Sequence, residues 1–419
     1  MKWKNERINR HWMSGLFIGT LLILGMPLDG SIPMPAGLIR ESNPIASATE
    51  IIGTRAVTSI VWGGIYVVAL LAIAISPYHL IKEIKNHLVF LLLFMGVFIS
   101  ALWSPYPERN LFDGFQLLGV LAVCLVASQR YKSNIPLLFK HTTFALGLNL
   151  LINLLAIIAL PRMTMHPDGR WAGVTGSANY LGDISLCCIW ACFAWLAQAE
   201  LKGKWFPIIV LMVAAISLIG SNSITSLFSS LIVLALFIYM YWLSPSKWRL
   251  AKTIAFYLIV ISGVLTVAFT GVDYWLSLLG RDSSVTGRNI IWLGAIHLIQ
   301  AKPLLGYGFS SNTETLGVLH WATTFHNGFL EVGVKLGLIG LFLFVYTIFQ
   351  FFRTLSVGQH SHSAERAMGI FVVTYLFYNL SETAILMAKN PAWIIFSTII
   401  FTIGIQKTRQ LSNNALISK

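Results

Sequence analysis

The residue best suited to acid–base chemistry is His326, which with Asn327 opens a long apolar run containing Gly337 and Gly340. A helix beginning there would present partial positive charge and N–H groups that bind anions. A neutral histidine at that position can take a proton from a hydroxyl group. Alternatively, Asn327 caps the helix, His326 lies at headgroup level and the glycines allow close helix packing. Helix caps are common and catalytic histidines are few, so spacing alone favours this second interpretation.

Two arginines are candidates for binding a phosphate. Arg288 follows Thr286 and Gly287, and Arg170 precedes Trp171. A guanidinium can clamp a phosphate with two hydrogen bonds and still lie near lipid headgroups. The alternative is that each arginine simply extends to the membrane interface.

Two further polar clusters allow two interpretations each. Asn179 and Asp183 lie one helical turn apart, where they could bind sugar hydroxyls or pair with neighbouring helices. The run 221–226 is rich in serine and is either the floor of a polar pocket or a helix cap with small packing residues. We favour the cap for this run.

The amino-acid composition indicates the class of protein that carries these residues. Of 419 residues, 56% are apolar and 11% are charged, and the mean hydropathy is +0.73. Such a chain lies mostly in lipid, which excludes soluble classes. All four cysteines lie inside apolar runs, and no paired histidine or carboxylate completes a metal site. The sequence therefore predicts neither a disulfide framework nor a metal.

Apolar runs of about 17 to 25 residues cross a bilayer as helices. We count about twelve, which predicts an all-α polytopic protein with a single membrane domain over 1–419. The first run follows a basic N-terminus as in a signal peptide, but no small-residue cleavage site is evident, so we interpret it as a retained first helix. The predicted spans are 12–28, 56–76, 88–103, 112–128, 142–160, 179–197, 205–220, 225–243, 253–271, 327–352, 367–388 and 391–406.

Basic residues predict the orientation, because Lys and Arg accumulate in cytoplasmic loops. With both termini cytoplasmic, 19 of the 29 Lys and Arg but only four of the 16 acids fall on the inner side. The net charge of +13 is therefore a topology signal and gives no reason to expect nucleic-acid binding. Basic residues on the outer face are not required by this rule, so chemistry is sought there.

The longest polar interruption is the outer loop 272–326. A largely apolar helix is expected within it from Arg288 to Ala301, lying at the membrane interface. Pro303 should stop that helix, and nearby glycines should form a turn. A second outer loop, 161–178, contains Arg170.

The chain resembles the superfamily of O-antigen ligases and of O-antigen and exopolysaccharide polymerases, which are bacterial inner-membrane proteins. The weaker similarities are at 102–105 and 169–182, and many relatives carry an arginine where Ile224 and Thr225 stand here. The specific motifs are His326-Asn327 with Gly337-x-x-Gly340, Leu279-Gly280-Arg281-Asp282 leading to Thr286-Gly287-Arg288 and Trp292, and Pro303-Leu304-Leu305-Gly306-x-Gly308.

This resemblance implies a membrane glycosyltransferase that needs no metal or cofactor and takes a glycan from undecaprenyl pyrophosphate on the periplasmic face. It implies that His326 deprotonates an acceptor sugar hydroxyl. Arg288, Arg170 and Arg281 would hold the departing pyrophosphate, whose growing charge they can balance. Asn179 and Asn327 are the candidates for substrate contacts. The expected partners are the lipid-linked glycan donor, membrane lipids and an acceptor that is either a lipid-linked glycan or lipid A core.

The stretch 279–292 is slightly closer to exopolysaccharide or O-antigen polymerases than to ligases, which are the first alternative. A transporter of lipid-linked sugars is an alternative of another class, and polar residues at the bilayer midplane would mark it. The candidates for that role are few: Asn149, Asn153 and Asn379. A structural partner in an export complex is a third possibility, and it would tolerate loss of His326 and Arg288.

Overall fold

The computed structural model describes residues 2–26, 44–75, 87–198, 202–243, 288–318, 324–357 and 363–403. Over these ranges the secondary structure is helical, apart from one isolated β-bridge between Met165 and Trp171. The predicted all-α class is confirmed.

Several of the described helices have starts that are encoded locally. Pro107 begins one helix, with Glu108 in its first turn and Arg130 in its last, as the helix dipole favours. Ser177 caps another by accepting a hydrogen bond from the Tyr180 N–H at 3.4 Å. The helices are α1 (Lys2–Leu22), α2 (Pro44–Ile75), α4 (Leu88–Ile99), α5 (Pro107–Tyr131), α6 (Pro136–Ala159), α7 (Pro161–Thr164), α8 (Ala178–Leu196), α9 (Trp205–Ser221), α10 (Ile224–Phe237), α13 (Arg288–Ala301), α14 (Gly328–Val357) and α15 (Ser363–Tyr378), followed by a helix over Pro391–Ile403.

Six of the described helices are long and apolar enough to cross a membrane, so the chain is a multi-pass membrane protein. Five shorter apolar helices accompany them. The predicted span at 253–271 and the outer loop up to residue 287 lie outside the described residues, so the number twelve stays a prediction. The six helices are Val57–Ile75, Pro107–Tyr131, Pro136–Ala159, Ala178–Leu196, Ile224–Tyr241 and Gly328–Leu355.

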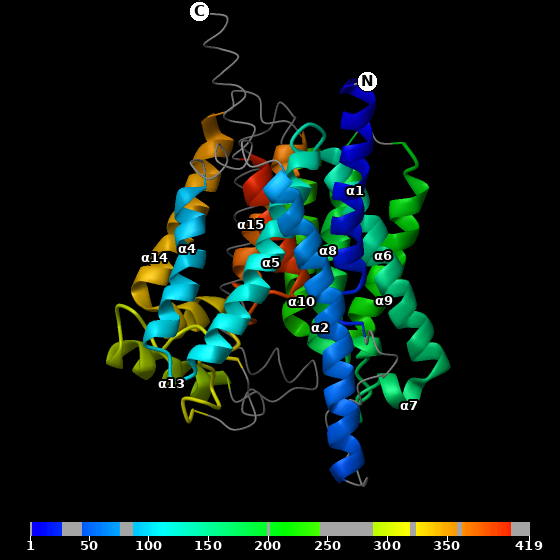
Figure 1. Cartoon of the computed structure of the whole chain (residues 1–419). Helices are drawn as coiled ribbons and strands as arrows, with labels where there is room; N and C mark the ends of the chain where they lie inside the picture. The colour runs from blue at the N-terminus through cyan, green and yellow to red at the C-terminus, as the bar shows by residue number, and fades with distance from the viewer. Residues whose placement is uncertain are drawn as a thin grey trace, which may run out of the picture.

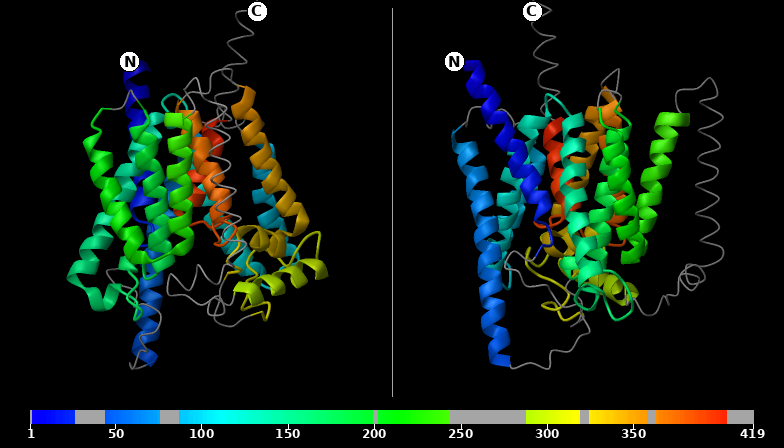
Figure 2. Two further views of the ribbon diagram at one scale, coloured as in Figure 1. Left: turned by 180° about the vertical axis from the view of Figure 1, so that it is seen from behind. Right: turned by 90° about the vertical axis from the view of Figure 1, so that its right-hand side faces the viewer.

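The helices stand side by side, and α1 begins at the end of the molecule opposite α7 and α13 (Figures 1 and 2). Helix α8 packs against α6, α9 and α10, while α14 packs against α4 and α13. The loops that follow α6, α13 and α15 meet at the end that carries α7 and α13. We call this end the loop face.

Helix α14 is broken at Gly337, whose φ of 66° and ψ of −168° are not helical. The chain after α13 crosses α14 at this point: a Cβ on Gly337 would lie 2.2 Å from the Leu304 carbonyl oxygen. Beyond the break, the Leu338 N–H donates to the Pro303 carbonyl at 2.7 Å. On the other side of the break, the Tyr307 N–H donates to the Val334 carbonyl at 2.9 Å. The crossing loop therefore replaces hydrogen bonds that the break removes.

The predicted span over 327–352 corresponds to Gly328–Leu355, which is long and apolar enough to cross a membrane, but its helix is interrupted at Gly337 and is not continuous as expected. A short helix, 328–336, precedes the break, and a second helix follows it to Val357. Only glycine reaches the backbone conformation of Gly337 at little cost. Figure 1 shows the lower part of α14 turning across the loop face.

The predicted span over 367–388 is also too long, because α15 ends at Tyr378. The Asn379 side chain ends it: its Oδ1 accepts the N–H groups of Ala384 at 2.8 Å and Ile385 at 3.2 Å. Residues 379–390 form a loop before the next helix begins at Pro391. The start of this loop is apolar enough to have been counted as part of the predicted membrane span.

Helix α13 has the predicted bounds and shows apolar residues on two sides. Ile291 and Ala295 are buried and form a small core with Phe325 and Val334. A second row of apolar side chains is exposed, as a helix lying on a bilayer surface requires. These exposed residues are Ile290, Leu293 and Ile296.

Candidate active site

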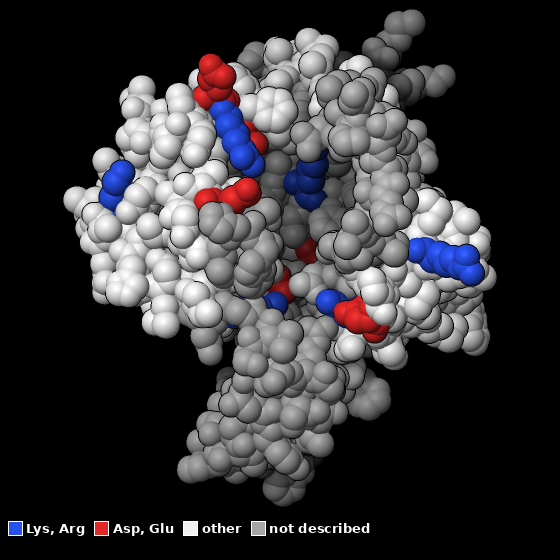
Figure 3. Space-filling view, turned by 90° about the horizontal axis from the view of Figure 1, so that it is seen from below, with Lys and Arg blue, Asp and Glu red and all other residues white. Residues whose placement is uncertain are grey.

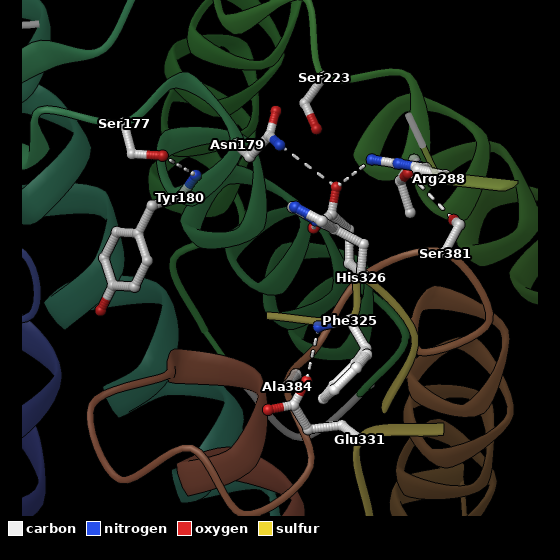
Figure 4. A network of polar contacts seen from close by, with 12 residues as sticks. Ser177, Asn179, Tyr180, Ser223, Arg288, Phe325, His326, Glu331, Ser381 and Ala384 are labelled. Atoms are coloured by element: carbon white, nitrogen blue, oxygen red, sulfur yellow. Dashed lines mark hydrogen bonds and ion pairs between the residues drawn. The ribbon is translucent and has the colours of Figure 1, made fainter. Parts of the chain in front are cut away.

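The centre of the candidate site is the carboxylate of Glu382, in the loop after α15. Its Oε1 accepts hydrogen bonds from the Arg288 guanidinium at 2.8 Å and from Asn179 Nδ2 at 3.3 Å. Its Oε2 lies 3.3 Å from His326 Nδ1. Figure 4 shows Asn179, Arg288 and His326 converging from three separate parts of the chain. One carboxylate thus joins a histidine, an arginine and an amide.

The burial of this group explains why it needs these partners. Only 10% of the Glu382 side chain is exposed, against 26% for Arg288 and 28% for His326. A buried carboxylate without a partner is costly, and a guanidinium at hydrogen-bond distance offsets that cost. The more exposed histidine and arginine can reach a substrate while Glu382 stays behind them.

His326 is held by its own backbone and by its neighbours. Its φ of 47° is in the left-handed region, which is uncommon for residues other than glycine and turns the chain sharply into α14. Both backbone polar groups of the preceding Phe325 are hydrogen-bonded. Its N–H donates to Glu331 Oε2 at 2.8 Å, and its carbonyl accepts from Trp292 Nε1 at 3.1 Å. The histidine is therefore presented from a rigid turn.

Asn327 caps α14 and also ties it to the Glu382 loop. Its Oδ1 accepts the N–H groups of Phe329 and Leu330, both at 3.0 Å, and its Nδ2 donates to the Leu380 carbonyl at 2.9 Å. The cap weighed in the sequence is thus present, and it directly follows the histidine. Asn327 holds the turn in register with the loop that carries Glu382.

Gly328 lets the two segments approach closely. Its N–H lies within hydrogen-bond distance of the carbonyls of Asn379, at 2.8 Å, and Glu382, at 3.0 Å. A Cβ at this position would lie 2.3 Å from Asn379 Oδ1. The sequence His-Asn-Gly therefore supplies the turn, the cap and the space that the Glu382 loop needs.

The other end of the Glu382 loop is anchored to α8. Asn390 Nδ2 donates to the buried carboxylate of Asp183, with Oδ2 at 2.6 Å. The Tyr180 hydroxyl donates to the Lys389 carbonyl. Of the two interpretations of Asp183, pairing with a neighbouring segment is the one that this contact bears out.

Arg170 reaches the same site from the loop before α8. One terminal guanidinium nitrogen, Nη2, donates to Asn179 Oδ1 at 2.6 Å, and its Nε donates to the Ser221 carbonyl at 3.0 Å. Asn179 therefore bridges Arg170 and Glu382. Figure 3 views the loop face and shows a hollow near its middle, with side chains of both charges around and within it.

The structure brings together four of the six residues named from the sequence: His326, Arg288, Arg170 and Asn179. Asn327 lies beside them in the role of a cap, and Arg281 falls outside the described residues. Sequence reasoning missed Glu382. The available signal was a carboxylate inside a run counted as a membrane span, where an ionisable residue marks function by default.

The three asparagines considered as marks of a transporter make structural hydrogen bonds. Asn149 Nδ2 donates to the Leu22 carbonyl at 2.7 Å and the Leu24 carbonyl at 2.9 Å. Asn153 Oδ1 accepts the Val174 N–H at 2.9 Å. With Asn379 they fix irregular backbone segments against helices.

Comparison with known proteins relates this site to polysaccharide assembly. Residues 208–345 match the model of the family described as O-Antigen ligase, and this range contains Arg288, His326 and Gly337. The predicted family resemblance is confirmed. The exopolysaccharide production protein ExoQ of Rhizobium meliloti (strain 1021) is 29% identical over 267 residues, which cover 58% of this chain and 60% of that protein.

Two Rickettsia proteins are similar over a longer stretch. One from Rickettsia felis, named "Putative polysaccharide ligase", is 24% identical over 338 residues, or 73% of this chain and 71% of that protein. One from Rickettsia conorii with the same name and the label RC0486 is 24% identical over 341 residues, or 76% and 73%. The chain is thus similar to proteins named for ligating or producing polysaccharides.

Proposed function

We propose that this protein is a glycosyltransferase that moves a glycan from undecaprenyl pyrophosphate to a sugar hydroxyl. The observation that carries the proposal is the position of Glu382 between His326 and Arg288. It links a candidate base to a candidate pyrophosphate ligand through one buried carboxylate. The O-Antigen ligase match and the similarity to ExoQ support the polysaccharide class of the substrates.

His326 is the general base in this proposal. In the neutral imidazole the N–H at Nδ1 donates a hydrogen bond to Glu382 Oε2. The lone pair of Nε2 can then accept the proton of the acceptor hydroxyl. The acceptor oxygen then bonds to the anomeric carbon, and the bond from that carbon to the pyrophosphate oxygen breaks. The imidazolium that forms is stabilised by the carboxylate, as in other histidine–carboxylate pairs.

The arginines balance the charge that develops on the leaving group. A guanidinium has five N–H donors, so the bond from Arg288 to Glu382 leaves donors that can bind phosphate oxygens. Arg170 would act beside it, and Arg281 is proposed for the same role from the resemblance. Fixed donors aimed at the leaving oxygens lower the barrier most when water is excluded. Once the glycan has been transferred, undecaprenyl pyrophosphate is released as the free carrier.

Asn179 and Asn327 support the reacting groups in different ways. Asn179 contacts both Arg170 and Glu382, so it sets their relative positions and can also meet a substrate hydroxyl. Asn327 fixes the turn at His326. We place this site on the periplasmic side of the bacterial inner membrane, because the inner ends of the predicted spans carry the excess of Lys and Arg.

We favour a polymerase, in which the acceptor is a second lipid-linked glycan. The name of ExoQ supports this choice, and the family description supports the alternative, a ligase whose acceptor is lipid A core. Both reactions use the same base and the same leaving group. The distinction therefore depends on the acceptor.

The test uses purified full-length protein in nanodiscs. With an undecaprenyl-pyrophosphate-linked repeat unit as the sole substrate, a polymerase produces a ladder of longer lipid-linked chains. A product formed only when lipid A core is added would establish the ligase. Flux of the lipid-linked glycan across liposomes without any new glycosidic bond would contradict the proposal and favour a transporter.

A further inference from the structure

A second hollow lies on the loop face beside Arg170, and the reaction proposed above makes no use of most of it. Its volume is about 420 Å³, within the range of small-molecule sites. The 161–178 loop and the α9–α10 turn form its walls. It is lined by Asp168, Gly169, Arg170, Trp171, Ile216, Ile219, Gly220 and Asn222.

One wall is the indole of Trp171, held in place by the end of α9. The backbone N–H of Trp171 donates to the Gly220 carbonyl at 2.8 Å, and a Cβ on Gly220 would lie only 2.1 Å from the indole Cε3. The ring therefore packs directly against this glycine. It is half-buried and still borders the hollow. Together with the exposed Ile216 and Ile219, it provides an apolar surface.

The remaining lining is polar. Asp168 is exposed and uses Oδ1 to accept the Arg170 N–H at 3.1 Å, within the turn that carries both residues. Asn222 ends α9 with φ of 45° and ψ of 41°, a left-handed conformation that asparagine tolerates better than most residues. Asn222 thus caps the C-terminus of α9, whereas Ser223, before α10, makes no side-chain capping hydrogen bond. The turn also places an exposed amide at the hollow.

These groups suit a sugar ring better than a phosphate. A pyranose presents apolar C–H faces and hydroxyls at its edge, which match an aromatic wall, a carboxylate and an amide. The Arg170 guanidinium donates to Ser221 and Asn179 on the side of the candidate active site, and the lining holds one carboxylate, Asp168, beside this one cation. The lining of the hollow therefore has no net formal charge to attract a phosphate dianion. The apolar residues are too few to hold a long isoprenoid chain away from the bilayer.

The hollow is joined to the candidate active site through Arg170. That side chain lines the hollow and donates to Asn179, which donates to Glu382, the partner of His326. A glycan held at the hollow would thus lie beside the reacting groups. Arg170 would contact both the bound sugar ring and Asn179 of the candidate active site.

We propose that the Trp171 hollow is a glycan subsite that binds a pyranose ring of a polysaccharide substrate. This inference rests on the proposed function, because it takes the substrate to be a glycan. The ring belongs either to the glycan of the donor or to that of the acceptor. The recognition chemistry is the same for both.

Two variants remove polar groups with little change in the backbone. Asp168→Asn keeps an oxygen for the Arg170 N–H and removes the charge. Asn222→Gly removes the amide, and glycine adopts the left-handed conformation readily. The control is Glu314→Gln, which removes an exposed charge in the loop after α13, away from the hollow.

The first measurement titrates protein in nanodiscs with the repeat-unit oligosaccharide released from its pyrophosphate carrier. Loss of one hydrogen bond to a charged or amide group should weaken binding about tenfold in each variant, and the control should bind as the unmodified protein does. In transfer assays, a rise of KM for the donor alone assigns the ring to the donor glycan. A rise for the acceptor alone assigns it to the acceptor.

Unchanged oligosaccharide binding in both variants would overturn the subsite, as would a protein that transfers glycan normally but does not bind the oligosaccharide. Weaker binding by the variants of a protein that forms no glycosidic bond would overturn the proposed transfer and leave the subsite standing. The two proposals can therefore fail separately.

Discussion

The carboxylate of Glu382 lies 3.3 Å from the Nδ1 atom of His326, although the two residues are 56 positions apart in the chain. The contact occupies Nδ1 of the imidazole, so Nε2 is the ring nitrogen left for a substrate proton. Histidines that act as bases commonly have such a partner, because it fixes the tautomer and stabilises the charged form. The proposed mechanism depends on this pair.

Replacing Glu382 with glutamine should therefore damage catalysis more than binding. The amide keeps the shape of the side chain but cannot stabilise an imidazolium. We expect kcat for glycan transfer to fall by about 10²- to 10⁴-fold, with KM changed little. Glu382→Asp, which restores the charge at a greater distance, should recover part of the rate. Equal rates for Glu382→Gln and the unmodified protein would remove Glu382 from the mechanism.

Replacing Arg288 with lysine should weaken the hold on the pyrophosphate. Lysine keeps the positive charge but loses the planar pair of donors that matches a phosphate. We expect KM for the lipid-linked donor to rise about tenfold or more. Arg109→Lys is a suitable control, since Arg109 is 58% exposed and its Nε lies 3.9 Å from Asp113 Oδ2. A donor KM that changes equally in both variants would contradict a specific role for Arg288.

Gly337→Ala should destabilise the fold through the break in α14. The new methyl group would meet the Leu304 carbonyl oxygen in a backbone conformation that essentially only glycine adopts. We expect a loss of about 2 to 5 kcal/mol in unfolding free energy, seen as a lower Tm in detergent. Gly317→Ala is the matched control: Gly317 has a φ of 70° and no neighbour within 4 Å. Equal effects at the two positions would show that the crossing is not tightly packed.

The orientation can be tested with single cysteines, because all four native cysteines are buried. Glu314→Cys lies in an exposed part of the loop after α13, and Lys202→Cys lies in the exposed connection before α9. A maleimide that does not cross the inner membrane should label position 314 in intact cells. It should label position 202 only after permeabilisation. The reverse pattern would place the candidate site in the cytoplasm.

The sequence predicted the all-α membrane fold, and it named four of the residues that the structure brings together around Glu382, for identifiable reasons. Long apolar runs are sufficient to define membrane helices, and α13 has the predicted bounds. His326, Arg288 and Arg170 were singled out by residue type and spacing, and the family resemblance then favoured their functional interpretation. The contacts among them come from separate loops, which spacing in the sequence does not reveal.

Glu382 and Gly337 show why the remainder was missed. Both lie in runs whose apolar composition resembles a continuous span. The loop at Glu382 depends on bonds from the Asn379 side chain to backbone N–H groups. The break at Gly337 depends on a distant segment, near Leu304, that takes over its backbone hydrogen bonds. Neither the local side-chain cap at Asn379 nor the tertiary contact at Gly337 can be read from hydropathy.

The central claim is that His326 acts as the base in glycan transfer, and one rate measurement tests it most directly. Purified protein and its His326→Ala variant, matched for amount and Tm, would be mixed with the undecaprenyl-pyrophosphate-linked repeat unit under single-turnover conditions. We expect chain extension by the unmodified protein and at least a hundredfold slower extension by the variant. Full transfer by His326→Ala at the same rate would contradict the account.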